Sequence, residues 1–249
     1  MAVTYFRNML NLHRCKVVFS FILVLFSTVA IAQKDQKISG KNLPNYDNRK
    51  MHYGFYLGAT ASRFNVDYSD EYIQRLQVAD SSGLRAANPK TTPGFTLGFV
   101  LSRQLGDYFT IRFLPGVGFY NRQIEFEDNG ELVNQEVPST TVHLPFLFKY
   151  MSKRRQNTRM YFVAGVTPSI DMGGSKRGER IDNKLRVDKN NFQIEYGVGV
   201  DLFYPFFKFA PEIRVAHGVP NILITDNNPY SRSFQNLRTT TVTLYLNFE

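Results

Sequence analysis

Alternation of apolar and polar side chains dominates the chain from Met51 onward. Between Phe192 and Leu202 every second residue is apolar, and the residues between them are small, polar or charged. The same period of two runs through 207–216 and 241–248. This period is typical of β-strands that have one apolar face. The pattern therefore predicts an all-β fold.

Extending this pattern along the chain gives eight strands, each with the 9 to 11 residues that a tilted strand needs to cross a bilayer. Their approximate ranges are 51–66, 93–105, 108–124, 138–151, 158–170, 190–204, 206–217 and 237–249. The connections after the first, third, fifth and seventh strands are long (67–92, 125–137, 171–189 and 218–236), and the others are short. Strict alternation of long and short connections, with an even strand number, predicts an antiparallel up-and-down transmembrane β-barrel with long outer loops and short periplasmic turns.

Two local features modify this prediction. The segment 70–78 in the first long connection has apolar residues near one helical face, which predicts a short helix. Four prolines fall inside predicted strands, and each removes a donor from the sheet ladder. We expect bulges there, at Pro115, Pro145, Pro168 and Pro211.

The charged residues within the strands indicate which face meets lipid. A soluble barrel would turn its apolar side chains inward, so alternation alone leaves both orientations open. Four cations and three anions share the face opposite the apolar one, where they can neutralise one another in a narrow lumen: Arg112, Lys149, Glu195, Asp201, Lys208, Glu212 and Arg214. A hairpin turn at Tyr204–Pro205 would place Asp201 opposite Lys208. The same register would place Glu195 opposite Arg214, and such cross-strand pairs stabilise a sheet. We therefore predict a lumen charge network and an apolar outer wall.

The beginning of the chain has the three parts of a secretory signal peptide. Basic residues up to Lys16 precede an uncharged run that ends in Ala30-Ile31-Ala32. We predict a signal peptide over 1–32, cleaved near Ala32, then a periplasmic linker over 33–50 and the barrel over 51–249. An uncleaved anchor helix is the alternative, but the apolar run is short for a membrane span. Cleavage would remove Cys15, the one cysteine, and with it any disulfide.

Composition and motifs favour no catalytic or cofactor chemistry. The chain has 249 residues, 22 Phe and 14 Tyr, which is too aromatic for a disordered protein. The net charge of +9 comes without an arginine-rich run, so no nucleic-acid partner is expected. His52, His143 and His217 lie on different strands without a metal-ligand interval. No Ser-His-acid spacing, glycine-rich phosphate loop, cofactor motif or small-molecule substrate site is evident.

One short connection is strongly basic and contains no acid. Its cations are Lys153, Arg154, Arg155 and Arg159. One interpretation is contact with anionic lipid headgroups of the inner leaflet. The other is a periplasmic docking surface for a partner protein, and the sequence leaves both open.

Several strands together resemble the PorT-type outer-membrane barrels of Bacteroidetes. The segments are His52-Tyr-Gly-Phe-Tyr-Leu-Gly, Leu114-Pro-Gly-Val-Gly-Phe-Tyr, His143-Leu-Pro-Phe-Leu-Phe-Lys-Tyr and Asn191-Phe-Gln-Ile-Glu-Tyr-Gly-Val-Gly-Val-Asp-Leu. The resemblance implies a non-enzymatic component of type IX protein secretion, in some species linked to gliding motility, with no catalytic residues. It implies other secretion-system proteins as partners, besides outer-membrane lipid and lipopolysaccharide. The alternatives are a surface adhesion or membrane-stability barrel and, less favoured, a lipid-modifying outer-membrane enzyme.

Overall fold

The computed structural model describes residues 40–77, 84–128, 131–173, 185–224 and 229–249. The predicted signal peptide lies outside these residues. The strands are β1 (Met51–Tyr68), β2 (Leu84–Lys90), β3 (Thr92–Gln104), β4 (Phe109–Phe113), β5 (Gly116–Asp128), β6 (Glu131–His143), β7 (Phe146–Met151), β8 (Thr158–Asp171), β9 (Asn190–Phe203), β10 (Lys208–Gly218) and β11 (Phe234–Phe248). Two helices are described, α2 (Asp70–Gln77) and α3 (Pro229–Arg232).

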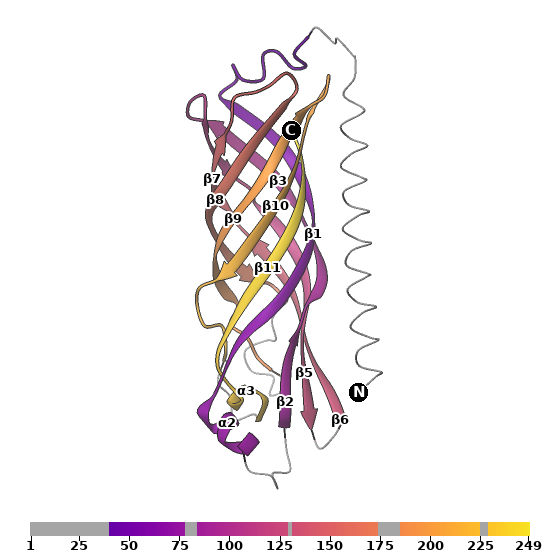
Figure 1. The fold of residues 1–249 in the computed structure, drawn as a ribbon, viewed down its shortest axis with the longest axis vertical. Helices are drawn as coiled ribbons and strands as arrows, with labels where there is room; N and C mark the ends of the chain where they lie inside the picture. The colour runs from indigo at the N-terminus through magenta and orange to yellow at the C-terminus, as the bar shows by residue number, and fades with distance from the viewer. Residues whose placement is uncertain (1–39, 78–83, 129–130, 174–184, 225–228) are drawn as a thin grey trace, which may run out of the picture. The chain divides into compact units, whose positions relative to one another are not determined.

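The strands close into an antiparallel barrel (Figure 1). β1 pairs with β3 on one side and with β11 on the other. The ring continues from β11 through β10 to β9, and the pairing of β8 with β9 closes it. The predicted fold class is therefore confirmed. We call the end that carries Met51 and Glu249 the short-turn end and the opposite one the long-loop end.

The described residues form eleven strands where the alternation predicts eight. Two predicted strands are each divided at a Leu-Pro pair, into β4 and β5 at Pro115 and into β6 and β7 at Pro145. The register is the same on both sides of the first break, because β3 pairs Leu101 with Phe113 and Gly98 with Gly116. Each divided strand therefore acts as one stave of the barrel. The remaining extra strand is β2, in the first long connection.

The carbonyl groups of two of the prolines still accept ladder hydrogen bonds, although proline has no amide to donate. Pro115 O accepts the amide of Phe99 at 2.9 Å, and Pro145 O accepts the amide of Leu114 at 3.1 Å. Pro168 stays within β8, in regular pairing with Phe192. The predicted bulges are absent from the pairings described at these positions, and the one register shift in β1 lies between Asp67 and Tyr68. Proline is accommodated here by strand breaks more than by bulges.

The long-loop end is more ordered than the alternation predicts. The predicted loop 125–137 is mostly a continuation of the β5–β6 hairpin, which pairs as far as Asp128 and Glu131. β2 adds to the free side of β5. The predicted short helix is confirmed as α2. No described helix is long and apolar enough to span a membrane.

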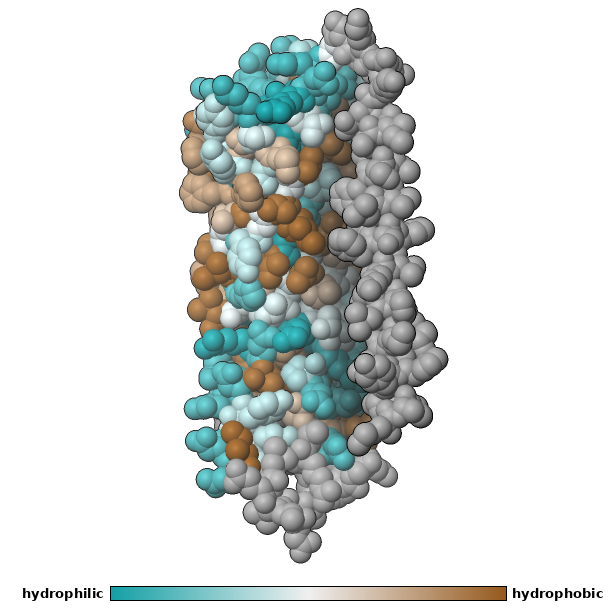
Figure 2. All heavy atoms as spheres, in the orientation of Figure 1, coloured by the Kyte–Doolittle hydropathy of each residue, from teal (hydrophilic) through white to brown (hydrophobic). Residues whose placement is uncertain are grey.

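The two faces of the barrel wall exchange their polarity along a single strand. In the first part of β1 the outward side chains are apolar, including Phe55 and Leu57, which are 51% and 50% exposed. After Ser62 the outward residues become Arg63 and Asn65, and the inward residue is the buried Phe64. Figure 2 shows the apolar side chains gathered in a band with hydrophilic zones toward both ends. This band is the part of the barrel that we expect to lie in the lipid bilayer, because an apolar outer wall is stable only in contact with lipid.

Beyond this band the barrel interior becomes an ordinary apolar core. Its buried members come from β1, α2, β2, β5, β11 and the last connections: Phe64, Tyr72, Ala87, Ile124, Phe126, Leu185, Ile222, Phe234 and Leu237. The outer wall here faces water, so the hydrophobic effect draws apolar groups inward. The long-loop end is thus a small folded layer beyond the apolar band.

Candidate functional site

The lumen within the apolar band is filled by charged side chains. All seven residues predicted to line it are buried, with relative exposures between 0% and 4%: Arg112, Lys149, Glu195, Asp201, Lys208, Glu212 and Arg214. Two further members, Arg159 and Glu249, are not among the residues predicted to line the lumen. Arg159 has the same parity as the inward Gly165 of β8, and Glu249 has the same parity as the inward Asn247 at the end of β11. The alternation along these strands could therefore have predicted both residues.

Asp201 on β9 is the centre of the network near the short-turn end. Its carboxylate accepts hydrogen bonds from Lys149 Nζ at 2.7 and 2.9 Å and from Arg159 Nε at 3.0 Å. Lys208 Nζ lies 3.8 Å from Asp201 Oδ1 and 2.8 Å from Glu249 Oε2. One buried carboxylate therefore joins cations from β7, β8 and β10.

Arg112 continues the network toward the long-loop end. Its guanidinium lies 3.6 Å from Glu249 Oε1 and donates a hydrogen bond to Glu212 Oε2 at 2.7 Å. Arg214 then bridges two carboxylates, with Nε 2.7 Å from Glu212 Oε1 and NH1 2.8 Å from Glu195 Oε2. Positive and negative groups thus alternate along the lumen. Such mutual compensation is what permits charges to be buried there.

The predicted β9–β10 register is wrong by two residues. Lys208 faces Phe203, and Arg214 faces Gly197, instead of Asp201 and Glu195. The opposite charges still meet, because the long side chains reach diagonally along the lumen. Gly197 provides the space: a Cβ added there would lie 2.6 Å from Arg214 Cγ.

The four cations predicted as a docking surface do not share one environment. Lys153 and Arg155 are exposed. Arg159 instead points into the lumen and is 6% exposed. The Arg154 guanidinium stacks on the Phe203 ring at 3.7 Å, and 5% of its side chain is exposed. The predicted docking surface cannot include all four cations, because the side chains of Arg154 and Arg159 are buried.

The described part of the predicted linker packs against the short-turn end of the barrel. Tyr46 stacks on His52 with ring centroids 3.9 Å apart and donates a hydrogen bond to Glu249 at 2.9 Å. Burial, reinforced by the Glu249 carboxylate, raises the pKa of the Tyr46 phenol far above its usual value. Asp47 lies 3.1 Å from Arg159 NH1 and 3.6 Å from Arg154 NH1. We call residues 41–50 the cap, because they cover the end of the charge network.

The histidines have structural contacts in different places. His143 Nε2 lies 2.9 Å from Tyr56 Oη and 3.0 Å from Thr96 Oγ1 inside the barrel. His217 contacts Tyr196 Oη at 3.1 Å on the outer wall. Within the described ranges, no group of three or more His, Cys, Asp or Glu side chains could hold a metal ion.

Comparison with protein families assigns the barrel. The family model described as "Outer membrane protein beta-barrel domain" matches residues 31–223. The chain belongs to this family. The barrel is therefore located in the outer membrane, with its apolar band facing lipid. No curated protein matches the chain.

Several solved outer-membrane proteins share a remote likeness to this barrel. OprG of Pseudomonas aeruginosa is 12% identical with a TM-score of 0.41, covering 78% of this chain and 92% of OprG. Neisserial surface protein A is 9% identical with a TM-score of 0.41, covering 80% and 98%. Ail of Yersinia pestis, solved with a heparin analogue, is 13% identical with a TM-score of 0.35, covering 80% and 99%. Likeness at this level carries no argument about function.

Proposed function

We propose that this outer-membrane barrel is a non-enzymatic accessory of type IX protein secretion that acts through protein contacts at its ends. The secretion role rests on the sequence resemblance described above. The filled lumen supports a role in binding other proteins and not in passing a polypeptide through the barrel. Arg112, Arg214, Tyr56 and Tyr161 are among the largest fully buried side chains. An eight-stave barrel has room for such side chains and none for a polypeptide.

The short-turn surface is the proposed docking site. Lys153 and Arg155 remain exposed, and the cap adds the exposed Lys41, Arg49 and Lys50. This basic surface fits an acidic face of a partner protein. Anionic lipid headgroups would satisfy the same charges, so the experiment must separate the two.

Gene deletion followed by comparison of secreted proteins tests the secretion role. The deletion strain is complemented with the wild type, with Lys153→Glu/Arg155→Glu, or with Arg63→Glu/Arg238→Glu as the control. The control reverses two exposed charges at the other end of the barrel. We expect the first pair to lose export while the barrel still inserts, and the control to restore export. Export that survives gene deletion would contradict the secretion role.

If the first pair restores export, the secretion role stands but short-turn docking is wrong. A protein partner predicts that cross-linking from position 153 captures a protein, whereas headgroup contact predicts cross-links to lipid alone.

A surface adhesion role is the second candidate. The β5–β6 hairpin, β2 and α2 form a folded layer with its own apolar core beyond the lipid-facing band. A rigid layer of this kind suits recognition better than loose loops do. Shortening the hairpin between 125 and 136 tests it: lost surface attachment with intact export would favour adhesion.

A further inference from the structure

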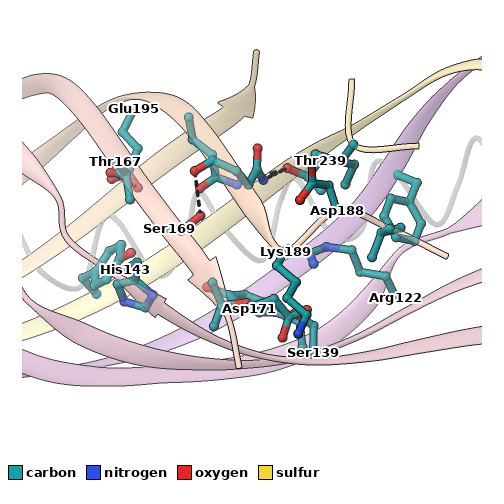
Figure 3. Close-up of a pocket in the computed structure, with 18 residues that line it drawn as sticks. Arg122, Ser139, His143, Thr167, Ser169, Asp171, Asp188, Lys189, Glu195 and Thr239 are labelled. Carbon is teal, nitrogen blue, oxygen red and sulfur yellow. Dashed lines mark hydrogen bonds between the residues drawn. The ribbon is translucent and has the colours of Figure 1, made fainter. Parts of the chain in front are cut away.

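β6 has a free edge at the long-loop end of the barrel. It pairs with β5 over its whole length, Glu131–His143, whereas on its other side β8 pairs only with 141–143. This second pairing stops near Asp171 of β8 and Ser139 of β6, which line the same cavity in Figure 3. Beyond this point β2, β5 and β6 continue as a three-stranded sheet that projects at the long-loop end in Figure 1. The outer edge of this sheet is β6.

The backbone groups of alternate residues point out of this edge. In an antiparallel sheet the N–H and C=O groups of one residue point to the same neighbouring strand. Leu144 donates its amide to Pro168 O of β8 at 3.0 Å. Thr140 O accepts the amide of Met172 at 2.7 Å, on the same side of β6. The register between β5 and β6 has no shift, so the even-numbered residues further along β6 also point away from β5: Leu132, Asn134, Glu136 and Pro138.

These residues form a template for one more strand. Each of them offers a carbonyl acceptor, and each except Pro138 also offers an amide donor. Their side chains are exposed, that of Leu132 to 66%. Among the described strands, none other than β5 pairs with 131–139 of β6. An exposed row of donors and acceptors at strand spacing is the feature to which an extended peptide adds by β-augmentation.

The outward face of the projecting sheet is acidic beside this edge. Lys90 forms an ion pair with Glu125. Glu136 instead accepts a hydrogen bond from the neutral amide of Gln123 at 2.8 Å, which leaves its charge in place. Glu127 adds a second carboxylate to the same face. Opposite charges on neighbouring strands stabilise their pairing and like charges oppose it, so the outward side chains of an added strand should be basic.

The inward face of the same strand is apolar. Val133 and Val137 alternate with the outward residues and are half-buried. Val137 packs against the apolar core of the long-loop end. Side chains on the inward face of an added strand would lie next to these valines. A strand that fits both faces therefore alternates basic and apolar residues.

We propose that the free edge of β6 binds an extended segment of a partner protein in which basic and apolar side chains alternate. The segment adds an antiparallel strand, with basic side chains beside Glu136 and apolar ones beside Val137. Residues directly opposite each other share a face, so the basic residues make the backbone hydrogen bonds to β6. Glu136 and Pro138 disfavour pairing with a second copy of the same edge. This inference is independent of the secretion role, because it concerns the opposite end of the barrel.

A labelled synthetic peptide, Thr-Val-Lys-Val-Lys-Val-Thr, tests the proposal by fluorescence anisotropy. It is titrated with the full chain refolded in zwitterionic micelles, with empty micelles as the blank. We expect saturable binding, and binding about fivefold weaker when Glu replaces both lysines. N-methylation of the two lysine amides, which face β6, should weaken binding about tenfold or more. N-methylation of two valine amides, which point away, should leave the affinity within about twofold.

A matched pair of variants at one edge position tests the same contact from the side of the barrel. Asn134→Pro removes an edge amide without removing a hydrogen bond to β5, and it should weaken binding of the lysine peptide about fivefold or more. Asn134→Ala keeps the amide and should bind like the wild type. The mobility of unheated samples on gels shows whether each variant is folded.

Equal effects of methylation at the lysines and at the valines, or an Asn134→Pro variant that binds like the wild type, would overturn pairing at this edge. Equal binding of the lysine and glutamate peptides would overturn the basic segment. A chain that forms dimers in sedimentation, and loses them with Asn134→Pro, would assign the edge to a second copy and overturn the proposed partner. If Asn134→Pro fails to fold, the methylated peptides decide the question with the wild type.

Discussion

Removing the charge of Asp201 should destabilise the barrel more than removing any exposed carboxylate. The change Asp201→Asn keeps the size of the side chain but leaves Lys149, Arg159 and Lys208 buried around a neutral group. Removing one partner of a buried ion pair costs about 3–5 kcal/mol. The folding equilibrium constant should therefore fall by about two to three and a half powers of ten.

The assay is urea unfolding of the barrel refolded in micelles. The chain has no Trp, so the folded fraction is followed by the mobility shift between folded and unfolded bands on unheated gels. Asp67→Asn is the matched control, because Asp67 is exposed and accepts one hydrogen bond, from Asn236 Nδ2 at 3.2 Å. We expect the control to change the unfolding free energy by about 0.5 kcal/mol or less.

A second variant separates loss of compensation from loss of a hydrogen bond. Adding Lys149→Met to Asp201→Asn removes one of the stranded cations, and the double variant should recover part of the lost stability. A loss below about 1 kcal/mol for Asp201→Asn, or a double variant less stable than the single one, would refute the reasoning that the lumen charges compensate one another.

The remaining predictions concern close packing, the cap and the lipid-facing wall. Gly165→Ala should destabilise folding by about 1–3 kcal/mol in the urea assay, because its Cβ would lie 2.0 Å from a backbone oxygen, whereas Gly106→Ala, with open space around it, should not. Tyr46→Ala should loosen the cap and speed tryptic cleavage within residues 41–50; unchanged cleavage would mean that Tyr46 does not hold the cap. Ile213→Arg, on the lipid-facing wall, should cost about 2–4 kcal/mol in lipid vesicles, and Gln235→Arg, exposed beyond the band, about 0–1 kcal/mol.

The period of two along the chain was enough to predict most of the barrel. Side chains in a strand alternate strictly between two faces, so the residues of 192–202 identify both the strand and its charged face without any tertiary information. The strand ranges that follow from this alternation also show which connections are long and which are short. Long and short connections in turn predict a closed antiparallel barrel. The docking prediction failed at Arg159 because the cations were grouped by nearness in sequence, although the strand phase directs that side chain inward.

The sequence by itself determined the strands, the polarity of their faces and the set of opposite charges that must share a narrow interior, because these depend on a local period of two and on charge balance. The tertiary structure alone decided which charges touch, since long side chains reach diagonally across staggered strands and no local rule specifies that reach. It also decided that the interior becomes apolar beyond Ser62 and that the Arg122 guanidinium packs on the Tyr120 ring and bonds to Ser62. Both depend on where the lipid band ends and on residues that only closure of the barrel brings together.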